Sequence, residues 1–140
     1  MDRILAPGRM AYIKGEKPEG CVFCRESARE KDLVLHEGTN CYIMMNKYPY
    51  TSGHLMVIPF RHVSDFEETS SEERAEMMDC VDMCVRALKA AFDPEGFNIG
   101  MNLGKVAGAG VDDHLHIHVV PRWVGDTNFS TVLGLSLIHI

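Results

Sequence analysis

The 140-residue sequence predicts a single domain of the α+β class, built from a largely antiparallel sheet and one long helix. Short apolar runs bounded by turn-forming residues indicate strands along most of the chain. One stretch, residues 70–92, instead has apolar residues at helical spacing. No internal repeat or linker-like composition divides the chain, so we expect one domain over residues 1–140.

The first part of the chain predicts an arm followed by a cysteine pair. Residues 1–20 mix glycine and proline with scattered apolar side chains, which is typical of a segment lying over a core. Cys21 and Cys24 then form a Cys-x-x-Cys pair. Such a pair can bind zinc, carry out dithiol chemistry or simply be buried, and the pair alone leaves all three open.

Three strands are predicted next, at Leu33–His36, Cys41–Asn46 and His54–Pro59. The first two are separated by the turn residues 37–40, and Pro59 ends the third because proline cannot donate to a sheet.

A helix is predicted from Ser70, which forms a capping-box sequence with Glu73. Its apolar residues recur every three or four positions: Met77, Val81, Cys84, Val85, Leu88 and Phe92. Residues 93–96 end the helix. A strand at Phe97–Asn102 and a glycine-rich loop at Gly104–Gly110 follow, and this loop can present backbone N–H groups to phosphate.

The most informative stretch is the alternation of His114, His116 and His118 with Leu115, Ile117 and Val119. Strict alternation predicts a half-buried strand with the imidazoles on one face and the aliphatic side chains against a core. Neighbours on one face lie about 6.6 Å apart, which is too far for direct imidazole contact but suits a chain of phosphates. One histidine is usually a surface residue, but burying three without partners is costly.

Imidazole chemistry makes the middle histidine the candidate nucleophile. A neutral imidazole attacks phosphorus to form a phosphoramidate that is easily reopened. If a backbone carbonyl holds Nδ1 of His116, its Nε2 is left to attack, while His118 would hydrogen-bond phosphate oxygens beside the scissile bond.

These residues resemble the signature of the histidine triad (HIT) family, in which three histidines alternate with apolar residues. Tyr48–His62 contains a Gly-His strand ending in Ile-Pro, which is similar to the other signature of the family. Residues 102–104, 107–110 and 121–129 most resemble the diadenosine-tetraphosphate phosphorylase-like branch. The resemblance extends from about Arg9 to Phe129.

The resemblance implies a HIT fold, usually a two-fold dimer, and an enzyme that cleaves dinucleoside polyphosphates by phosphorolysis or hydrolysis. His116 would attack the α-phosphorus and form a nucleotidyl-histidine, which water or phosphate then resolves. His114, His118 and His54 would support it. The expected nucleotide- and phosphate-binding residues are Asn46, at the position that contacts ribose, with Asn102, Gly108, Ala109 and Gly110.

The resemblance also implies a structural Zn²⁺ held by Cys21, Cys24, His62 and His114, a closed Cys₂His₂ set, and no organic cofactor. The chain departs from the family pattern just before the triad. Many members carry Gln, Ser or Thr there, whereas this chain has Gly110 and Val111 followed by Asp112 and Asp113. Residues 130–140 also differ from the usual polar continuation, and we interpret them as an atypical, truncated tail or a scar.

Other functions fit parts of the sequence. The three histidines could ligate a catalytic metal, but a span of about 13 Å is too long for one ion. A phosphoramidate hydrolase, or a zinc-stabilised nucleotide-binding module without catalysis, is the further alternative.

The net charge of −6 argues against nucleic-acid partners, and no run is long enough to span a membrane. Reduced cysteines and the lack of a signal region predict a cytoplasmic protein.

Overall fold

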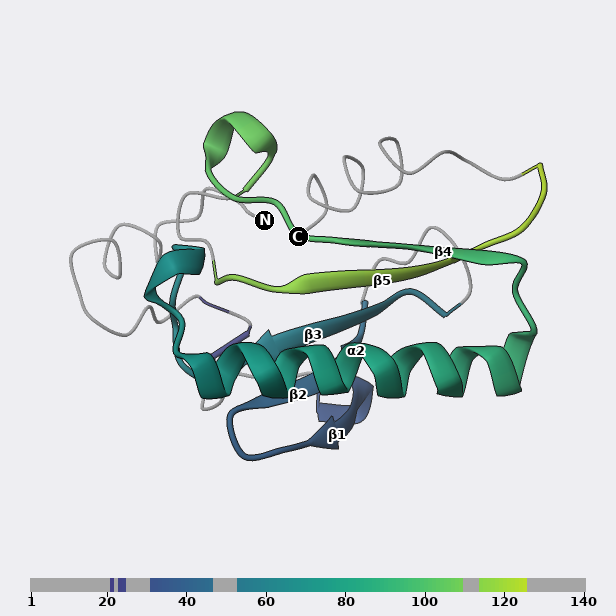
Figure 1. The fold of residues 1–140 in the computed structure, drawn as a ribbon, viewed down its shortest axis with the longest axis horizontal. Coiled ribbons are helices and arrows are strands. Elements are labelled where there is room, and N and C mark those ends of the chain that lie inside the picture. Colours follow the sequence, from purple (N-terminus) through teal and green to yellow (C-terminus); the bar gives the residue numbers. More distant parts are fainter. Residues whose placement is uncertain (1–20, 22, 25–30, 47–52, 110–113, 126–140) are drawn as a thin grey trace.

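The computed structural model describes residues 21, 23–24, 31–46, 53–109 and 114–125. Figure 1 shows one long helix lying along a five-stranded antiparallel sheet whose strand order is β1-β2-β3-β5-β4. The elements are β1 (Val34–Glu37), β2 (Cys41–Met45), β3 (Leu55–Pro59), α2 (Ser71–Phe92), β4 (Gly96–Gly100) and β5 (Ile117–Arg122). Short 3₁₀ turns lie at Lys31–Leu33, Phe66–Glu68 and Lys105–Ala107. The predicted α+β class is confirmed.

Helix α2 begins and ends where its capping residues predict. The Ser70 side chain accepts a hydrogen bond from the Glu73 backbone, and the Glu73 side chain accepts one from the Ser70 backbone. At the other end Asp93 adopts the left-handed conformation at φ 49°. The predicted apolar face is confirmed apart from Phe92, which is 45% exposed because it lies at the last turn.

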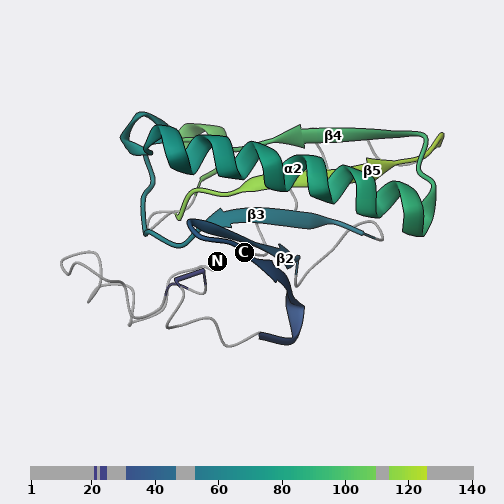
Figure 2. The ribbon, with the colours of Figure 1, turned by 60° about the horizontal axis from the view of Figure 1, so that its bottom comes forward.

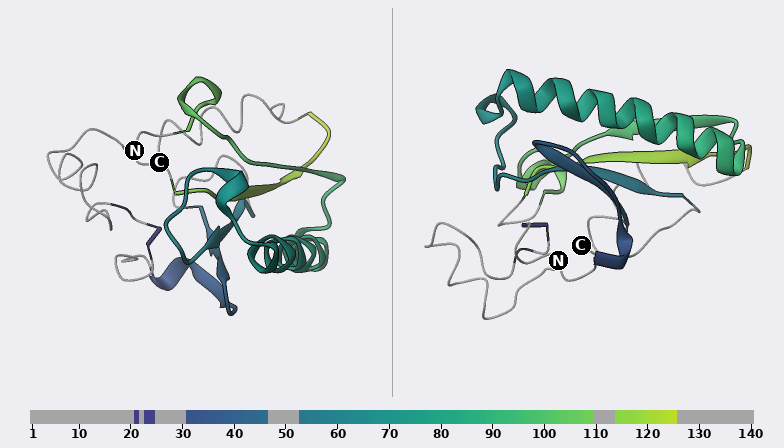
Figure 3. Two further views of the ribbon diagram at one scale, coloured as in Figure 1. Left: turned by 60° about the vertical axis from the view of Figure 1, so that its left-hand side comes forward. Right: turned by 90° about the horizontal axis from the view of Figure 1, so that it is seen from below.

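The three central strands β2, β3 and β5 are buried on both faces, and Figures 2 and 3 show α2 on one side of the sheet. The helix side packs alternate strand residues, among them Ile43, Val57 and Ile117, against α2. The opposite side packs Tyr42, Met44, Met56 and Ile58 against Cys21, Phe23 and Cys24. Leu115, Ile117 and Val119 all face the helix, as their alternation predicted, so the triad histidines point to the other face.

The strand at the triad is shorter than predicted. Strand β5 begins only at Ile117, and His114–His116 precede it. β4 stops at Gly100 opposite His118, and β3, which continues to Pro59, pairs with β5 only as far as Val57 and Ile117. Leu115 instead donates its N–H to the Val63 carbonyl at 2.8 Å. The remaining strands lie within two residues of their predicted bounds.

The predicted N-terminal arm (1–20) and atypical tail (130–140) lie outside the described residues, as do Asp112 and Asp113. All five cysteines are described, and none forms a disulfide, as expected for reduced thiols. Among the described helices, none is both long and apolar enough to cross a bilayer.

Candidate functional site

The triad histidines lie together on the sheet face opposite α2, and each is almost fully buried, with exposed fractions of 2%, 6% and 0% for His114, His116 and His118. Their rings are closer than the strand spacing predicted. The His116 and His118 centroids are 4.7 Å apart in a T-shaped arrangement. The expectation that they would not touch was wrong, because side chains lean along the strand and the regular ladder does not extend to His116.

A contact with the backbone orients the His116 ring. Its Nδ1 lies 2.8 Å from the carbonyl oxygen of His114. A carbonyl can only accept, so Nδ1 carries the hydrogen, and the lone pair of the neutral ring is on Nε2. The predicted carbonyl contact at Nδ1 is thus observed, whereas the role of His116 as nucleophile stays a prediction.

His54 contacts the last triad histidine from the neighbouring strand. Its Nε2 lies 2.9 Å from Nδ1 of His118, and the Asn46 side-chain nitrogen lies 3.2 Å from Nδ1 of His54. Asn46 and His54 are 2% and 1% exposed, so this row of polar groups is inside the protein. Sequence analysis placed His54 beside the triad but expected Asn46 to face ribose.

Burial keeps these imidazoles neutral near pH 7. It lowers the pKa of His54 to about 4, with a further contribution from the charge of His116. The pKa of His118 also falls well below its usual value, first through burial and then through the charges of His116 and His54.

The four predicted metal ligands come together at one end of the triad. The ligating atoms of Cys21, Cys24, His62 and His114 all lie within 4.8 Å of one another. Zn–S and Zn–N bonds in a tetrahedron place S and N atoms about 3.6 Å apart and two N atoms about 3.3 Å apart. The corresponding S···N distances to Nδ1 of His114 are 3.4 and 3.7 Å, and the N···N distance from His62 is 3.2 Å.

The protonation of the ligands also suits a cation. Nε2 of His114 donates to the Pro59 carbonyl at 2.7 Å, which leaves the Nδ1 lone pair facing the cysteines. The hydrogen bond from Cys21 lowers the pKa of Cys24 to about 3, whereas the same contact and burial raise the pKa of Cys21. These donors therefore fit Zn²⁺. The three triad histidines do not share a ligand set among the described residues, which disfavours a catalytic metal held by all three.

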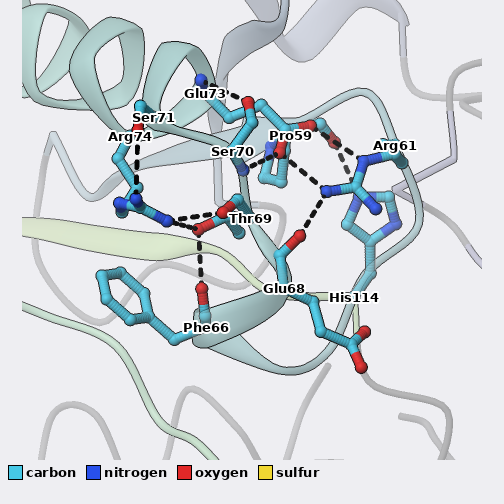
Figure 4. A network of polar contacts seen from close by, with 10 residues as sticks. All are labelled: Pro59, Arg61, Phe66, Glu68, Thr69, Ser70, Ser71, Glu73, Arg74 and His114. Atoms are coloured by element: carbon cyan, nitrogen blue, oxygen red, sulfur yellow. Dashed lines mark hydrogen bonds and ion pairs between the residues drawn. The ribbon is translucent and has the colours of Figure 1, made fainter.

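A network that sequence analysis missed holds the segment between β3 and α2 (Figure 4). Arg61 donates to both carboxylate oxygens of Glu73, at 2.8 and 3.1 Å, and to the Glu68 carbonyl at 2.7 Å. His62 is the next residue, so the network fixes the backbone of a candidate metal ligand. The capping-box glutamate was recognisable, but nothing local in the sequence indicated Arg61 as its partner.

The cysteine pair is tied to the sheet by aromatic contacts. Tyr42 donates its hydroxyl to the Phe23 carbonyl at 2.6 Å. The Phe23 ring lies 4.9 Å from the His116 ring. Phe23, one of the two residues between the cysteines, thus contacts the candidate nucleophile, and no sequence signal indicated this contact.

The predicted phosphate-binding loop is only partly described. Asn102 is half-buried at its start, and Gly110 lies outside the described residues. Gly108 and Ala109 donate their N–H groups to the carbonyls of Lys105 and Gly104, both at 3.0 Å. The Gly108 bond belongs to the 3₁₀ turn Lys105–Ala107, where a simple loop was expected. Phosphate binding by this loop stays a prediction.

Comparisons with known proteins agree with this geometry. The family model described as the HIT domain matches residues 27–124. The chain is 47% identical over 109 residues to a Mycobacterium tuberculosis protein named AP-4-A phosphorylase, covering 78% of this chain and 56% of that protein. It is 35% identical to the Arabidopsis thaliana adenylylsulfatase HINT3 over 73% of this chain and 52% of the relative. The chain therefore spans about half the length of these relatives.

Among solved structures, a Zn-bound histidine triad family protein from Mycobacterium smegmatis superposes with a TM-score of 0.68. The two chains are 32% identical, and the match covers 85% of this chain and 94% of the other. A HIT family member from Bacillus subtilis gives the same TM-score at 28% identity, with coverage of 79% and 82%. From its sequence signatures, its fold and these matches, this chain is a member of the histidine triad family.

Proposed function

We propose that this protein cleaves dinucleoside polyphosphates, such as diadenosine tetraphosphate, by transferring a nucleotidyl group to His116. The observation that carries this proposal is the 2.8 Å contact between Nδ1 of His116 and the His114 carbonyl, which directs the Nε2 lone pair into the site. His118, whose ring is 4.7 Å away, supplies the neighbouring donor.

The reaction has two displacements at the same phosphorus. In the first, Nε2 of His116 forms a bond to the α-phosphorus, and the bond from that phosphorus to the bridging oxygen breaks. The departing nucleoside polyphosphate receives a hydrogen bond from Nε2 of His118. In the second, an oxygen of inorganic phosphate attacks the phosphorus, and the N–P bond breaks. Diadenosine tetraphosphate and phosphate would thus give ATP and then ADP.

The choice of phosphate as the second acceptor is supported by the 47% identity to the protein named AP-4-A phosphorylase. The resemblance of residues 121–129 to that branch supports the same choice. Hydrolysis uses the same covalent intermediate, with water in place of phosphate. The proposed chemistry at His116 is common to both.

We also propose that Cys21, Cys24, His62 and His114 hold a structural Zn²⁺. Support comes from ligand spacings that fit a tetrahedron and from the similarity to a Zn-bound family member. A closed Cys₂His₂ ion supplies folding free energy rather than a reaction step. Its expected effect on chemistry is through the position of His114.

A homodimer joined through β4 is proposed for the assembly. β4 is the last strand in the sheet order, so its outer edge has no strand partner among the described residues and could pair with a second copy. Ile99 on β4 and Leu103 just after it are 43% and 41% exposed. Analytical ultracentrifugation tests this proposal: the natural protein should sediment as a dimer and the Ile99→Glu variant as a monomer. A natural protein that sediments as a monomer would contradict it.

The function is tested by incubating zinc-loaded protein with diadenosine tetraphosphate, with and without phosphate, and separating the products by ion-exchange chromatography. ADP and ATP that appear only with phosphate are expected. AMP and ATP without phosphate would replace phosphorolysis with hydrolysis. The His116→Ala variant should be inactive, whereas His36→Ala, on β1 at the opposite edge of the sheet from β4, should retain activity. Full turnover by His116→Ala would refute the proposal.

A further inference from the structure

We infer that Cys21 and Cys24 are a site of reversible oxidation: hydrogen peroxide joins their sulfur atoms in a disulfide, which releases the metal and loosens the hold on His116. This regulation rests on the proposed Zn²⁺ site and on the proposed role of His116. The Cys-x-x-Cys sequence alone leaves zinc binding and dithiol chemistry open. The geometry of the pair suits both, one in each oxidation state.

The two sulfur atoms are close enough to exchange a shared metal ion for a covalent bond. All four ligating atoms of the candidate metal centre lie within 4.8 Å of one another, and Cys21 and Cys24 are three positions apart in the chain. Two thiolates of a tetrahedral zinc site are about 3.8 Å apart, whereas a disulfide bond is about 2.0 Å long. The conversion therefore needs only a small local movement, and no distant segment has to shift.

Sulfur supplies half of the ligand set, so its oxidation removes the site. Nδ1 of His114 lies 3.4 Å from Sγ of Cys21 and 3.7 Å from Sγ of Cys24. Sγ of Cys24 is also 3.3 Å from Nδ1 of His62. The thiolate is the form of cysteine that ligates a metal, so a disulfide withdraws both sulfur ligands at once. Two imidazoles remain of a closed four-ligand site, and Zn²⁺ is released.

The oxidation is balanced with hydrogen peroxide as the oxidant. One thiolate attacks a peroxide oxygen, so that an S–O bond forms, the O–O bond breaks and hydroxide leaves, which gives a sulfenic acid. The second thiolate attacks this sulfur, so that the S–S bond forms, the S–O bond breaks and a second hydroxide leaves. Two protons from solvent convert the hydroxides to water. The two sulfur atoms lose two electrons, and a dithiol reductant returns them.

The sheet separates this pair from the other thiols. The other three cysteines pack in the apolar cluster between the sheet and α2: Cys41, Cys80 and Cys84. Buried thiols in apolar surroundings are inert. Cys21 and Cys24 lie on the opposite face of the sheet, beside His62, which is only half-buried. A small oxidant can therefore approach the metal centre from the side of His62.

The residues around the metal also hold the candidate nucleophile. Phe23 lies between the two cysteines, and its ring centroid is 4.9 Å from that of His116. The backbone carbonyl of His114 accepts a hydrogen bond from Nδ1 of His116 at 2.8 Å. Formation of the disulfide shifts the backbone that carries Phe23, and loss of the ion removes a contact that fixes the ring of His114. His116 thus loses support from two neighbours.

The experiment treats the zinc-loaded full chain with hydrogen peroxide. A chromogenic chelator measures released Zn²⁺, and non-reducing peptide mapping locates the disulfide. We expect zinc release together with a bond between Cys21 and Cys24, and dithiothreitol with added Zn²⁺ should reverse both. Ring ¹⁵N NMR signals of His114 and His116 should shift on oxidation, whereas those of His36 on β1 should not. Adenylylation of His116 should fall about 10-fold and return on reduction.

Two matched variants address the remaining thiols. Sγ of Cys41 lies 3.5 Å from Sγ of Cys80, so this contact is the competing place for a disulfide. Cys80→Ser removes that pair, and Cys84→Ser removes another buried thiol of α2. Both variants should release zinc at the rate of the natural protein. Zinc release that requires Cys80 would show that the wrong pair had been assigned.

Other results would also overturn this regulation. Zinc retained after oxidation, a disulfide found only between Cys41 and Cys80, or unchanged His116 signals after zinc release would each do so. A chain that binds no zinc before peroxide is added would refute the proposed metal centre and the regulation with it. Zinc release, peptide mapping and NMR need no turnover. A failure to cleave diadenosine tetraphosphate would therefore count against the proposed function alone.

Discussion

The backbone carbonyl of His114 accepts a hydrogen bond from Nδ1 of His116 at 2.8 Å. The same His114 donates from Nε2 to the Pro59 carbonyl and presents Nδ1 to two cysteines. One residue therefore belongs to both the candidate metal centre and the candidate active site. The ring of His114 faces the other candidate metal ligands, and its backbone carbonyl holds the candidate nucleophile.

Removing the metal should consequently lower both stability and turnover. We expect chelation to lower the thermal midpoint and kcat together, because His114 loses a fixed ring position, and added Zn²⁺ should restore both. Cys24→Ala should reproduce the effect without chelator, whereas Cys84→Ala, a buried thiol on α2, should leave the metal content unchanged. Metal analysis, calorimetry and kinetics check this. A folded, fully active protein with no bound metal would contradict it.

Arg61→Ala should destabilise the fold by about 1–2 kcal/mol, because Glu73 is left as a buried carboxylate without its cation. It should also weaken zinc binding, since His62 follows Arg61 directly. Arg86→Ala is the matched control, because its ion pair with Asp82 is 79% and 62% exposed and should contribute less than about 0.5 kcal/mol. Urea unfolding and zinc competition check this. Equal effects of the two substitutions would argue against a stabilising role for the Arg61–Glu73 ion pair.

Gly53→Ala should displace His54. Gly53 has φ +84°, and an added Cβ would lie 2.8 Å from Cδ2 of Leu88. Gly125→Ala is the control, because Gly125 has φ +92° but nothing within 4 Å of the added atom. Backbone strain should lower the free energy of unfolding of both variants by about 1 kcal/mol. Only Gly53→Ala should lower it further and also reduce kcat. Identical losses in urea unfolding would show that the Leu88 contact is unimportant.

Acid should destabilise the protein through His54. Its pKa is lowered from 6.5 to about 4 by burial. Below pH 6.5 the unfolded chain therefore binds a proton that the folded chain does not, and the free energy of unfolding falls as the pH falls toward 4. The loss from this residue is roughly 3 kcal/mol. Comparison with His54→Gln at each pH isolates it, because both proteins have the same metal ligands. If the free energies of unfolding of the two proteins fell in parallel as the pH fell, His54 would not be the cause of the acid destabilisation.

Much of this fold was predictable because its determinants are local. The capping box at Ser70 set the start of α2, and the alternation around His116 set which face carries the imidazoles. The metal ligands His62 and Cys24 were placed by the family resemblance, and their ligating atoms lie 3.3 Å apart.

What could not be predicted depends on contacts between distant segments. The contact between the side chains of Asn46 and His54 follows from the hairpin register and from a side-chain rotation that a sequence does not encode locally. The early end of the ladder at Ile117 depends on the stop of β4 at Gly100 and on the loss of pairing with β3 beyond Val57. The Arg61–Glu73 ion pair likewise joins the segment after β3 to the start of α2. In the sequence alone, Arg61 has no feature that distinguishes it from an ordinary surface cation.

The most direct test of the account is to find the covalent intermediate. Zinc-loaded protein is mixed with diadenosine tetraphosphate without phosphate, quenched with alkali to preserve phosphoramidates, digested and analysed by mass spectrometry. We expect one adenylyl group on the peptide containing His116, located to that residue by fragmentation, absent in His116→Ala and discharged when phosphate is added before the quench. Substrate cleavage with no adenylylated peptide, or with the group on another residue, would contradict nucleophilic attack by His116.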